Sequence, residues 1–241
     1  MTVQCTVGGD GEDVLVALTG ELGLPDVPAV RLRLMKCLAE QPAALLLDLA
    51  DLTVREPLAL TVFTAVTRQA ARWPGTPVLF CAPRPATRHM LTGGPFHRLP
   101  VFDTTDAARE HVWQERETLP SLIDELLPIS GAARQARNVA TDACLRWDLP
   151  ELVAPASLIV SELVSNVVDH AHTMMTLDLS LRHRYLNMAV RDGSPDEPVA
   201  PGDVPAEAAG GRGLFLVNAT AHSWGWLPTD DGKVVWAALQ R

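Results

Sequence analysis

The chain has 241 residues, of which 47% are hydrophobic and 20% are charged. This length and composition agree with two soluble domains of ordinary size, each with its own core. The formal net charge is −9, which argues against nucleic acid as the direct partner, because phosphate contacts need a basic stripe. An acidic balance suits a partner protein with a basic surface.

Signals for export and for membrane insertion are missing from the sequence. No apolar stretch reaches the ~18 residues that a membrane span needs, and the N-terminus lacks the basic flank and apolar core of a signal peptide. We therefore expect a cytoplasmic protein. The cysteines lie far apart without metal-binding spacing, so we expect reduced, mostly buried thiols. They are Cys5, Cys37, Cys81 and Cys144.

Strands and helices alternate in the first half of the chain. Short apolar runs at 14–18, 44–49 and 77–82 predict buried strands. Apolar residues at helical spacing predict helices over 27–38 and 57–73. This alternation predicts an α/β layer domain, to which we assign residues 1–115.

A boundary between two domains is expected at residues 116–128. The segment is polar and charged at its start, and Pro120 and Pro128 bracket what we interpret as a short apolar helix. Residues 129–241 then form the second domain. It opens with a helix predicted over 132–147.

The most informative motif of the second domain is a row of polar residues on one predicted helix. Glu162, Asn166 and His170 are spaced four apart, which places them on one helical face. A carboxylate beside an amide oxygen suits Mg²⁺, which proteins hold through one or two groups plus substrate phosphates. The alternative is an amphipathic helix with a solvated polar face. No partner at zinc-ligand spacing accompanies His170, so a structural or supporting role is expected for it.

Two further motifs follow in order. An apolar run, 186–190, is followed by Asp192 and Gly193, where an acidic side chain can receive the amino group of a base; an ordinary turn after a strand is the alternative. Glycines at 210, 211 and 213 then open an apolar helical run, where backbone N–H groups can face an anion. A flexible loop before a helix is the alternative, and the pattern fits neither a P-loop nor a Rossmann fingerprint.

In this order, and with Asp-Gly-Lys-Val-Val-Trp at 231–236, the motifs resemble the Bergerat-fold ATPases, and more narrowly the RsbW-like anti-sigma-factor serine kinases. The resemblance covers about residues 128–241 and implies a second α/β sandwich that binds ATP with Mg²⁺. It implies that Glu162 is the general base, that Asn166 holds Mg²⁺ and that Asp192 reads the adenine amino group. The nucleotide-binding residues would be Asn166, Asp192, Gly193, Gly211, Arg212, Gly213 and Leu214.

The first half resembles STAS domains, the fold of anti-sigma-factor antagonists. Leu45-Leu46-Leu47-Asp48-Leu49, the helix after it and the strand at 77–82 carry the resemblance, together with Gly20-Glu21-Leu22. Antagonists have an Asp-Ser-Ser-Gly signature at the start of that helix, whose first serine accepts phosphate. Here the acidic position is Glu56 and the acceptor position is Pro57. Proline has no hydroxyl, so the domain is either an unswitchable regulator or a packing module.

The two resemblances together imply a regulatory protein of the partner-switching type. We expect an anti-sigma factor that is also a serine/threonine protein kinase, with a sigma factor or a STAS-domain antagonist as partner. A non-catalytic anti-sigma or scaffold protein is the alternative, and retention of Glu162 favours the enzyme. A histidine kinase is disfavoured, because no helix pair with an acceptor histidine precedes the ATP-binding domain. A homodimer is left open, and neither direct nucleic-acid nor membrane binding is expected.

Overall fold

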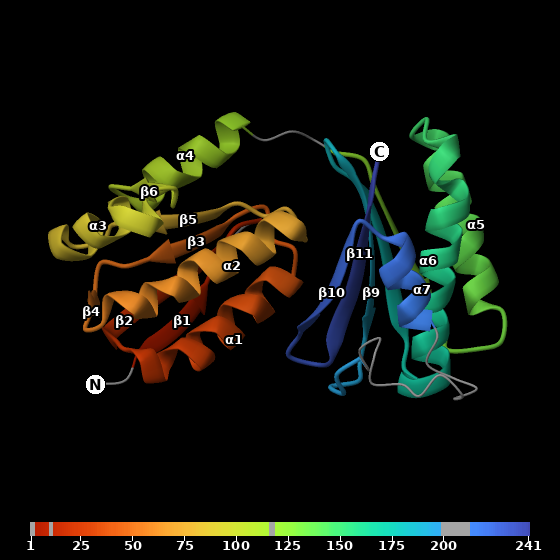
Figure 1. Ribbon diagram of the computed structural model, residues 1–241, viewed down its shortest axis with the longest axis horizontal. Coiled ribbons are helices and arrows are strands. Elements are labelled where there is room, and N and C mark those ends of the chain that lie inside the picture. The colour runs from red at the N-terminus through yellow and green to blue at the C-terminus, as the bar shows by residue number, and fades with distance from the viewer. Residues whose placement is uncertain (1–2, 10–11, 116–118, 199–212) are drawn as a thin grey trace. The chain divides into compact units, whose positions relative to one another are not determined.

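The computed structural model divides into two compact units, at residues 1–117 and 118–241. Each unit has its own sheet and its own helices, and Figure 1 follows the chain from red in the first unit to blue in the second. We call them unit 1 and unit 2. The structure describes residues 3–9, 12–115, 119–198 and 213–241.

Unit 1 is built on a mixed sheet with strand order β1-β2-β3-β5-β6. β1 is antiparallel to β2, the other pairs are parallel, and β4 pairs with the end of β2. β5 is buried along its whole length, which explains why its sequence is a continuous apolar run. The strands are β1 (Gln4–Gly8), β2 (Val14–Leu22), β3 (Leu45–Asp48), β4 (Leu52–Val54), β5 (Val78–Cys81) and β6 (Val101–Phe102).

Helices lie on both faces of this sheet. α1 and α2 run side by side, and α4 packs against β3, β5 and β6 (Figure 1). Phe63 of α2 meets Phe80 of β5 edge to face, with ring centroids 5.1 Å apart, a favoured aromatic geometry. The predicted α/β layer domain is confirmed. The helices are α1 (Val27–Ala39), α2 (Thr61–Arg72), α3 (Pro85–Thr92) and α4 (Thr105–Glu115), with short 3₁₀ turns η1 (Leu24–Asp26), η2 (Pro57–Leu60) and η3 (Gly94–Phe96).

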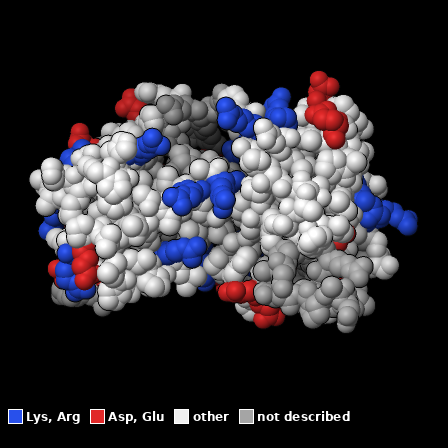
Figure 2. All heavy atoms as spheres, in the orientation of Figure 1, with Lys and Arg blue, Asp and Glu red and all other residues white. Residues whose placement is uncertain are grey.

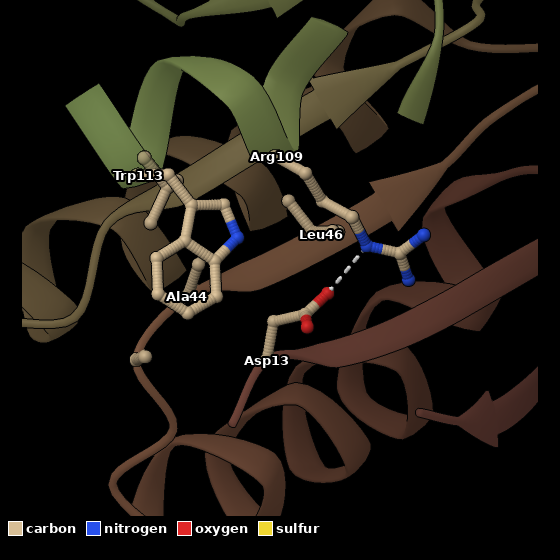
Figure 3. Close-up of a pocket in the computed structure, with 7 residues that line it drawn as sticks. Asp13, Ala44, Leu46, Arg109 and Trp113 are labelled. Carbon is tan, nitrogen blue, oxygen red and sulfur yellow. Dashed lines mark hydrogen bonds and ion pairs between the residues drawn. The ribbon is translucent and has the colours of Figure 1, made fainter. Parts of the chain in front are cut away.

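An ion pair fixes α4 to the sheet of unit 1. Arg109 Nε donates to Asp13 Oδ2 at 2.9 Å, and Trp113 lies beside Ala44 and Leu46 (Figure 3). The hydrogen bond to Asp13 raises the pKa of Arg109. The cavity between these residues holds about 10 Å³, room for about one water molecule. It is therefore a packing contact and not a ligand site.

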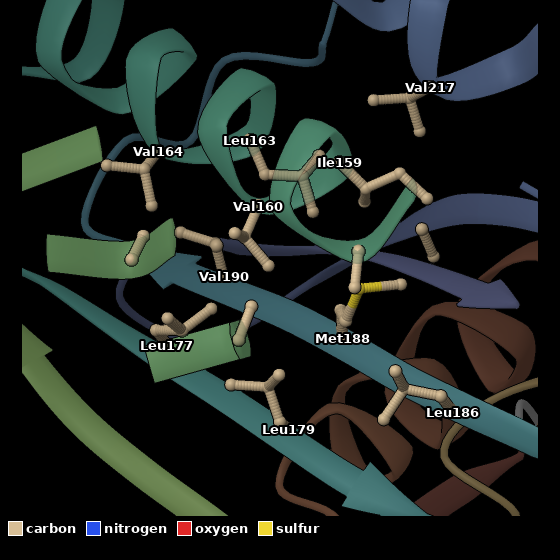
Figure 4. Packing of buried hydrophobic residues seen from close by; sticks show 14 of the residues in the cluster. Ile159, Val160, Leu163, Val164, Leu177, Leu179, Leu186, Met188, Val190 and Val217 are labelled. Carbon is tan, nitrogen blue, oxygen red and sulfur yellow. The ribbon is translucent and has the colours of Figure 1, made fainter. Parts of the chain in front are cut away.

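Unit 2 is an antiparallel sheet covered on one face by helices. The strand order is β10-β11-β9-β8-β7. Figure 4 shows α6 residues Ile159, Leu163 and Val164 above Leu177 of β8 and Met188 of β9. The unit is an α/β sandwich, as predicted. Its elements are β7 (Ser121–Leu126), α5 (Ala132–Arg146), η4 (Pro150–Leu152), α6 (Val153–Asn166), η5 (Val167–Ala171), β8 (Met175–Leu181), β9 (Tyr185–Asp192), α7 (Gly213–Thr220), β10 (Ser223–Pro228) and β11 (Lys233–Gln240).

The short helix expected within the linker 116–128 is wrong. Residues 121–126 form β7, which pairs antiparallel with β8. Leu122, Asp124 and Leu126 alternate with more exposed neighbours, which is the period of a strand with one face on a core. The alternation of buried and exposed residues spans only six positions, which is too short to distinguish a strand from a helix by sequence pattern. The segment is thus one of the two edge strands of the sheet in unit 2.

The expectation that no stretch is long and apolar enough to span a membrane is also corrected. Within the described residues, the helical stretch 150–171 meets that test, with a mean hydropathy of 1.4 over its best window. Its apolar residues include Ile159, Val160, Leu163 and Val164, all of which are buried in the core of unit 2 (Figure 4). Burial against the sheet accounts for the composition of this helix.

Positive charge gathers locally in spite of the acidic total. α1 and α2 carry basic residues and no acidic ones, and Figure 2 shows blue side chains over this part of unit 1. The net charge of −9 therefore does not describe every face of the molecule. The basic residues of the two helices are Arg31, Arg33, Lys36, Arg68 and Arg72.

Candidate functional site

The first wall of the site is the end of α6. Glu162 and Asn166 lie one turn apart on this helix and are partly exposed, while Leu163 and Val164 between them are buried. The apolar side of α6 is fixed by the core, so the side bearing Glu162 and Asn166 is held toward the start of α7. The predicted placement of these two residues on one face follows from α-helical spacing.

The helix changes its geometry immediately after Asn166. η5 is a π-helical turn, in which the N–H of His172 donates to the carbonyl of Val167 at 2.8 Å. His172 has a φ of 55° and ends the helix in the left-handed region. Single π turns inside helices occur often at functional sites. His170 lies in this turn and lines the same cavity as Asn166.

Gly213, the first residue of α7, lies against the polar side of α6. A Cβ added there would come within 2.7 Å of Glu162 Oε2 and 3.4 Å of Asn166 Oδ1. A side chain at this position would displace the Glu162 carboxylate. The N-terminus of α7 and the carboxylate and amide of α6 therefore meet at one place.

The opposite wall is formed by a buried ion pair at the end of the sheet. Asp192 is the last residue of β9, and its cross-strand partner is Lys233, the first residue of β11. Lys233 Nζ lies 2.9 Å from Asp192 Oδ1, and the two side chains are 10% and 1% exposed. The backbone N–H of Ser194 donates to the same oxygen at 2.8 Å. Lys233 Nζ also donates to the carbonyl of Ser194 at 3.1 Å.

Two turns support this pair. The N–H of Gly193 donates to Thr173 Oγ1 at 3.0 Å. In the turn between β10 and β11, a Cβ added at Gly232 would overlap the backbone carbonyl of Asp192. The turn residue Asp231 accepts hydrogen bonds from Arg191 Nη2 and Thr229 Oγ1, both at 2.8 Å. These bonds lower the pKa of Asp231. The turn thus holds the ends of β9 and β11 together.

Between the two walls lies a cavity of about 390 Å³, a volume typical of small-molecule sites. Its floor is largely apolar, and a few polar side chains from α6, η5, β9 and β11 converge on it. Asp196, Glu197 and Pro198 also line it, so two more carboxylates reach the cavity. The remaining lining residues are Leu163, Asn166, Val167, His170, Ala171, Val190, Asp192, Ser194, Leu214, Lys233 and Val235.

The predicted site residues take different places around this cavity. Asn166, Asp192 and Leu214 line it directly. Glu162 and Gly213 meet at its α6–α7 side, and Gly193 supports the turn after Asp192. Gly211 and Arg212 lie outside the described residues.

Sequence reasoning missed Lys233, Ser194 and Thr173 as parts of the site. Lys233 belongs to the Asp-Gly-Lys-Val-Val-Trp motif, but the motif assigns it no role. Its signal was a lone lysine at the start of an otherwise apolar strand, where β11 is buried from Lys233 to Leu239. Ser194 and Thr173 carried no signal, because their contacts depend on how two turns meet.

The chemistry of the cavity is consistent with a purine nucleotide bound with Mg²⁺. A largely apolar floor that ends at a carboxylate suits a base ring with an amino group. Among the described residues, no three His, Cys, Asp or Glu side chains form a metal cluster. Mg²⁺ commonly uses one or two protein groups and takes its other ligands from phosphates and water, so the single amide of Asn166 fits that role.

The comparison with protein families agrees with this geometry. Residues 130–239 match the family model described as "Histidine kinase-like ATPase domain". The matched range starts just before α5 and ends within β11, so it includes the whole cavity. The match therefore supports the ATPase-type domain that the sequence motifs predicted for the second half of the chain.

Among solved structures, the N-terminal part is similar to anti-sigma-factor antagonists. An antagonist from Mycobacterium paratuberculosis is 23% identical, with a TM-score of 0.42, covering 46% of this chain and 95% of that one. The antagonist SpoIIAA in its unphosphorylated form is 14% identical, with a TM-score of 0.40, covering 47% and 100%. The phosphorylated SpoIIAA of Bacillus is 15% identical, with a TM-score of 0.36, covering 45% and 99%. No curated protein matches the chain.

Proposed function

We propose that the chain is a partner-switching regulator whose unit 2 binds Mg-ATP and phosphorylates a serine or threonine of a STAS-domain partner. In this role it would also hold a sigma factor as an anti-sigma factor. The observation that carries the proposal is the cavity in the region of the family match, where Asn166 and Asp192 converge. Glu162 and Gly213 meet beside it.

Four residues in or beside the cavity have parts in the proposed reaction. Asp192 accepts a hydrogen bond from the adenine amino group, and Asn166 binds the Mg²⁺ that neutralises phosphate charge. Glu162 takes the proton of the attacking hydroxyl, and Gly213 brings backbone N–H groups at the start of α7 toward the phosphates. Phosphoryl transfer depends mostly on positioning and charge neutralisation, so this short set of residues is sufficient for it.

A binding protein without kinase activity is the second candidate. Asp196 and Glu197 line the cavity, and negative side chains there oppose a triphosphate. An anti-sigma factor or scaffold would need no general base and would tolerate weak nucleotide binding. The retained Glu162 beside Gly213 supports the kinase over this alternative.

The first test separates binding from chemistry. Glu162→Gln preserves shape but removes basicity, so we expect ATP binding within about twofold of wild type and a loss of transfer of about 10²–10⁴-fold. Calorimetry measures binding, and transfer of labelled phosphate to candidate STAS proteins measures activity. Glu151→Gln, an exposed glutamate in η4, is the matched control and should behave as wild type. Transfer at the wild-type rate by Glu162→Gln would contradict the assigned base.

The second test concerns the metal. Asn166→Ala should weaken binding of Mg-ATP by about tenfold or more, as expected for the loss of a metal ligand or its support, with the fold intact because the residue is partly exposed. Asn138→Ala, on the exposed side of α5, is the control. No ATP binding by the wild-type protein at millimolar ATP would overturn the proposed function as a whole.

A further inference from the structure

We propose that Lys233 and Asp192 together recognise the adenine base, with Lys233 donating a hydrogen bond to ring nitrogen N1. The inference rests on the proposed function, because it concerns the same cavity. It adds a residue to base recognition that the sequence motifs did not assign. In this arrangement Asp192 binds the adenine amino group and Lys233 binds the neighbouring ring nitrogen.

The hydrogen bonds of the pair leave one donor and one acceptor unused. An ammonium group has three N–H donors. Within the described residues, Lys233 Nζ uses two of them, on Asp192 Oδ1 and on the carbonyl of Ser194. Asp192 Oδ1 accepts from Lys233 and from the N–H of Ser194, and no bond within the described chain is made by Oδ2. One N–H and one carboxylate oxygen therefore remain for a ligand.

The pair is positioned by the sheet and not by a mobile loop. Asp192 and Lys233 are directly opposite in the β9–β11 register, which brings their Cβ atoms to about 5 Å on one face of the sheet. Both residues line the cavity. Gly232 fixes the start of β11 against the carbonyl of Asp192. The unused donor and acceptor therefore lie side by side on a rigid edge.

Adenine carries the complementary groups in adjacent positions. On its Watson–Crick edge the exocyclic amino group is a donor and N1 is an acceptor. In the same pose guanine would place a carbonyl oxygen against the carboxylate and an N–H against the ammonium. Both contacts would be repulsive and would leave buried polar groups unpaired. The pair consequently selects adenine, and the hydrogen bond from Lys233 is charge-assisted.

Nucleotide analogues test the contact on the wild-type protein. We expect ATP to bind about 10–100-fold more tightly than 1-deaza-ATP, in which a C–H replaces N1, since a hydrogen bond to a charged group is lost. GTP should bind more weakly than ATP by at least the same factor. Calorimetry with Mg²⁺ present measures each affinity. Equal binding of ATP and 1-deaza-ATP would overturn the role of Lys233 while leaving ATP binding intact.

A variant of Lys233 tests whether this residue makes the contact with N1. Lys233→Met should lower ATP affinity by about 10–100-fold and should no longer distinguish ATP from 1-deaza-ATP. Lys36→Met, at the only other lysine of the chain, is the matched control. If Lys233→Met does not fold because Asp192 loses its partner, the analogue series on wild type still decides the question. Absence of any ATP binding by wild type would overturn the proposed function and this inference with it.

Discussion

At the scale of single residues, the contact between Gly213 and Glu162 decides whether the predicted base is held in place. The glycine is the first residue of α7, and the carboxylate is the group that a side chain there would meet first. The end of a glutamate side chain can move at little cost to stability. A substitution at Gly213 should therefore disturb chemistry more than folding.

Gly213→Ala tests this separation. The added Cβ would come within 2.7 Å of Glu162 Oε2, so the carboxylate must shift, and a misplacement of this size can cost about 10²-fold in rate. We expect a loss of transfer of that order with a change in ATP affinity of less than about tenfold. Gly8→Ala is the control, because nothing lies within 4 Å of its added Cβ. An unchanged rate of phosphoryl transfer in Gly213→Ala would argue against Glu162 as the general base.

At the scale of elements, the turn between β10 and β11 supports the buried pair of the cavity. Gly232 approaches Asp192 and Gly193 so closely that an added Cβ would overlap backbone atoms. Backbone cannot rotate away as a side chain can. The turn and the end of β9 must therefore move apart if Gly232 is replaced.

Gly232→Ala should destabilise unit 2 by about 1–3 kcal/mol, the usual cost of overpacking, and should weaken ATP binding because Asp192 and Lys233 shift. Chemical denaturation measures the first effect and calorimetry the second. Gly8→Ala again reports the general cost of adding a methyl group. Wild-type stability and affinity in Gly232→Ala would show that the turn does not support the site.

Asp231 in the same turn should give the stability of unit 2 a weak dependence on pH. Hydrogen bonds from Arg191 and Thr229 lower the pKa of Asp231 below its ordinary value of 3.8, so the ionised carboxylate stabilises the folded chain above that pH. This contribution is lost as the pH falls through the lowered pKa. The carboxylate is 70% exposed, so Asp231→Asn should cost less than about 1 kcal/mol at pH 7. The difference from wild type should shrink in urea melts as the pH falls below 3.8 and through the lowered pKa.

Pro57 begins η2 at the position where the STAS antagonists that the sequence resembles would carry the acceptor serine. Pro57 is exposed and follows Glu56, whose side chain accepts a hydrogen bond from the N–H of Leu24 at 2.6 Å. Pro57→Ser would place an accessible hydroxyl at a helix start, where added negative charge is favoured. We expect a kinase of this type to add one phosphate to Pro57→Ser and none to Pro57→Ala. Mass spectrometry detects the added phosphate. Phosphate at residues 50–65 of the wild type would contradict the hypothesis that phosphorylation cannot switch unit 1.

At the scale of the whole molecule, each unit carries a buried thiol that reports its unfolding. Burial raises the pKa of Cys81 in unit 1 to about 12, with a further contribution from Asp48. Burial also raises the pKa of Cys144 in unit 2 to about 11, with a smaller effect of Glu151. Only thiolates react with alkylating agents, so both thiols should be inert at pH 8 in the folded chain.

Mg-ATP should slow the alkylation of Cys144 in partial denaturant, because a ligand stabilises the folded unit that binds it. Alkylation of Cys81 should change less, since it lies in the core of unit 1. Mass spectrometry after timed alkylation measures both thiols in one sample. Equal protection of the two cysteines would show that nucleotide binding stabilises the chain as a whole.

The sequence by itself determined the elements whose pattern is local. Continuous apolar runs predicted β3 and β5, and helical spacing predicted α1, α2 and the face of α6 that bears Glu162 and Asn166. These patterns persist because buried surface must be apolar at the period of the element. The ordered motifs also predicted the ATPase-type domain that the family match supports.

Tertiary structure decided what depends on contacts between distant segments. β7 was read as a helix because its identity as a strand depends on pairing with β8, about fifty residues away. Lys233 was not recognised because its partner, Asp192, lies across a strand pair and not nearby in sequence. Gly213 was predicted for its loop, but its approach to Glu162 follows from how α7 packs on α6. Periodicity is a local property of the chain, whereas the register of a sheet and the meeting of two helices are set only when the core closes.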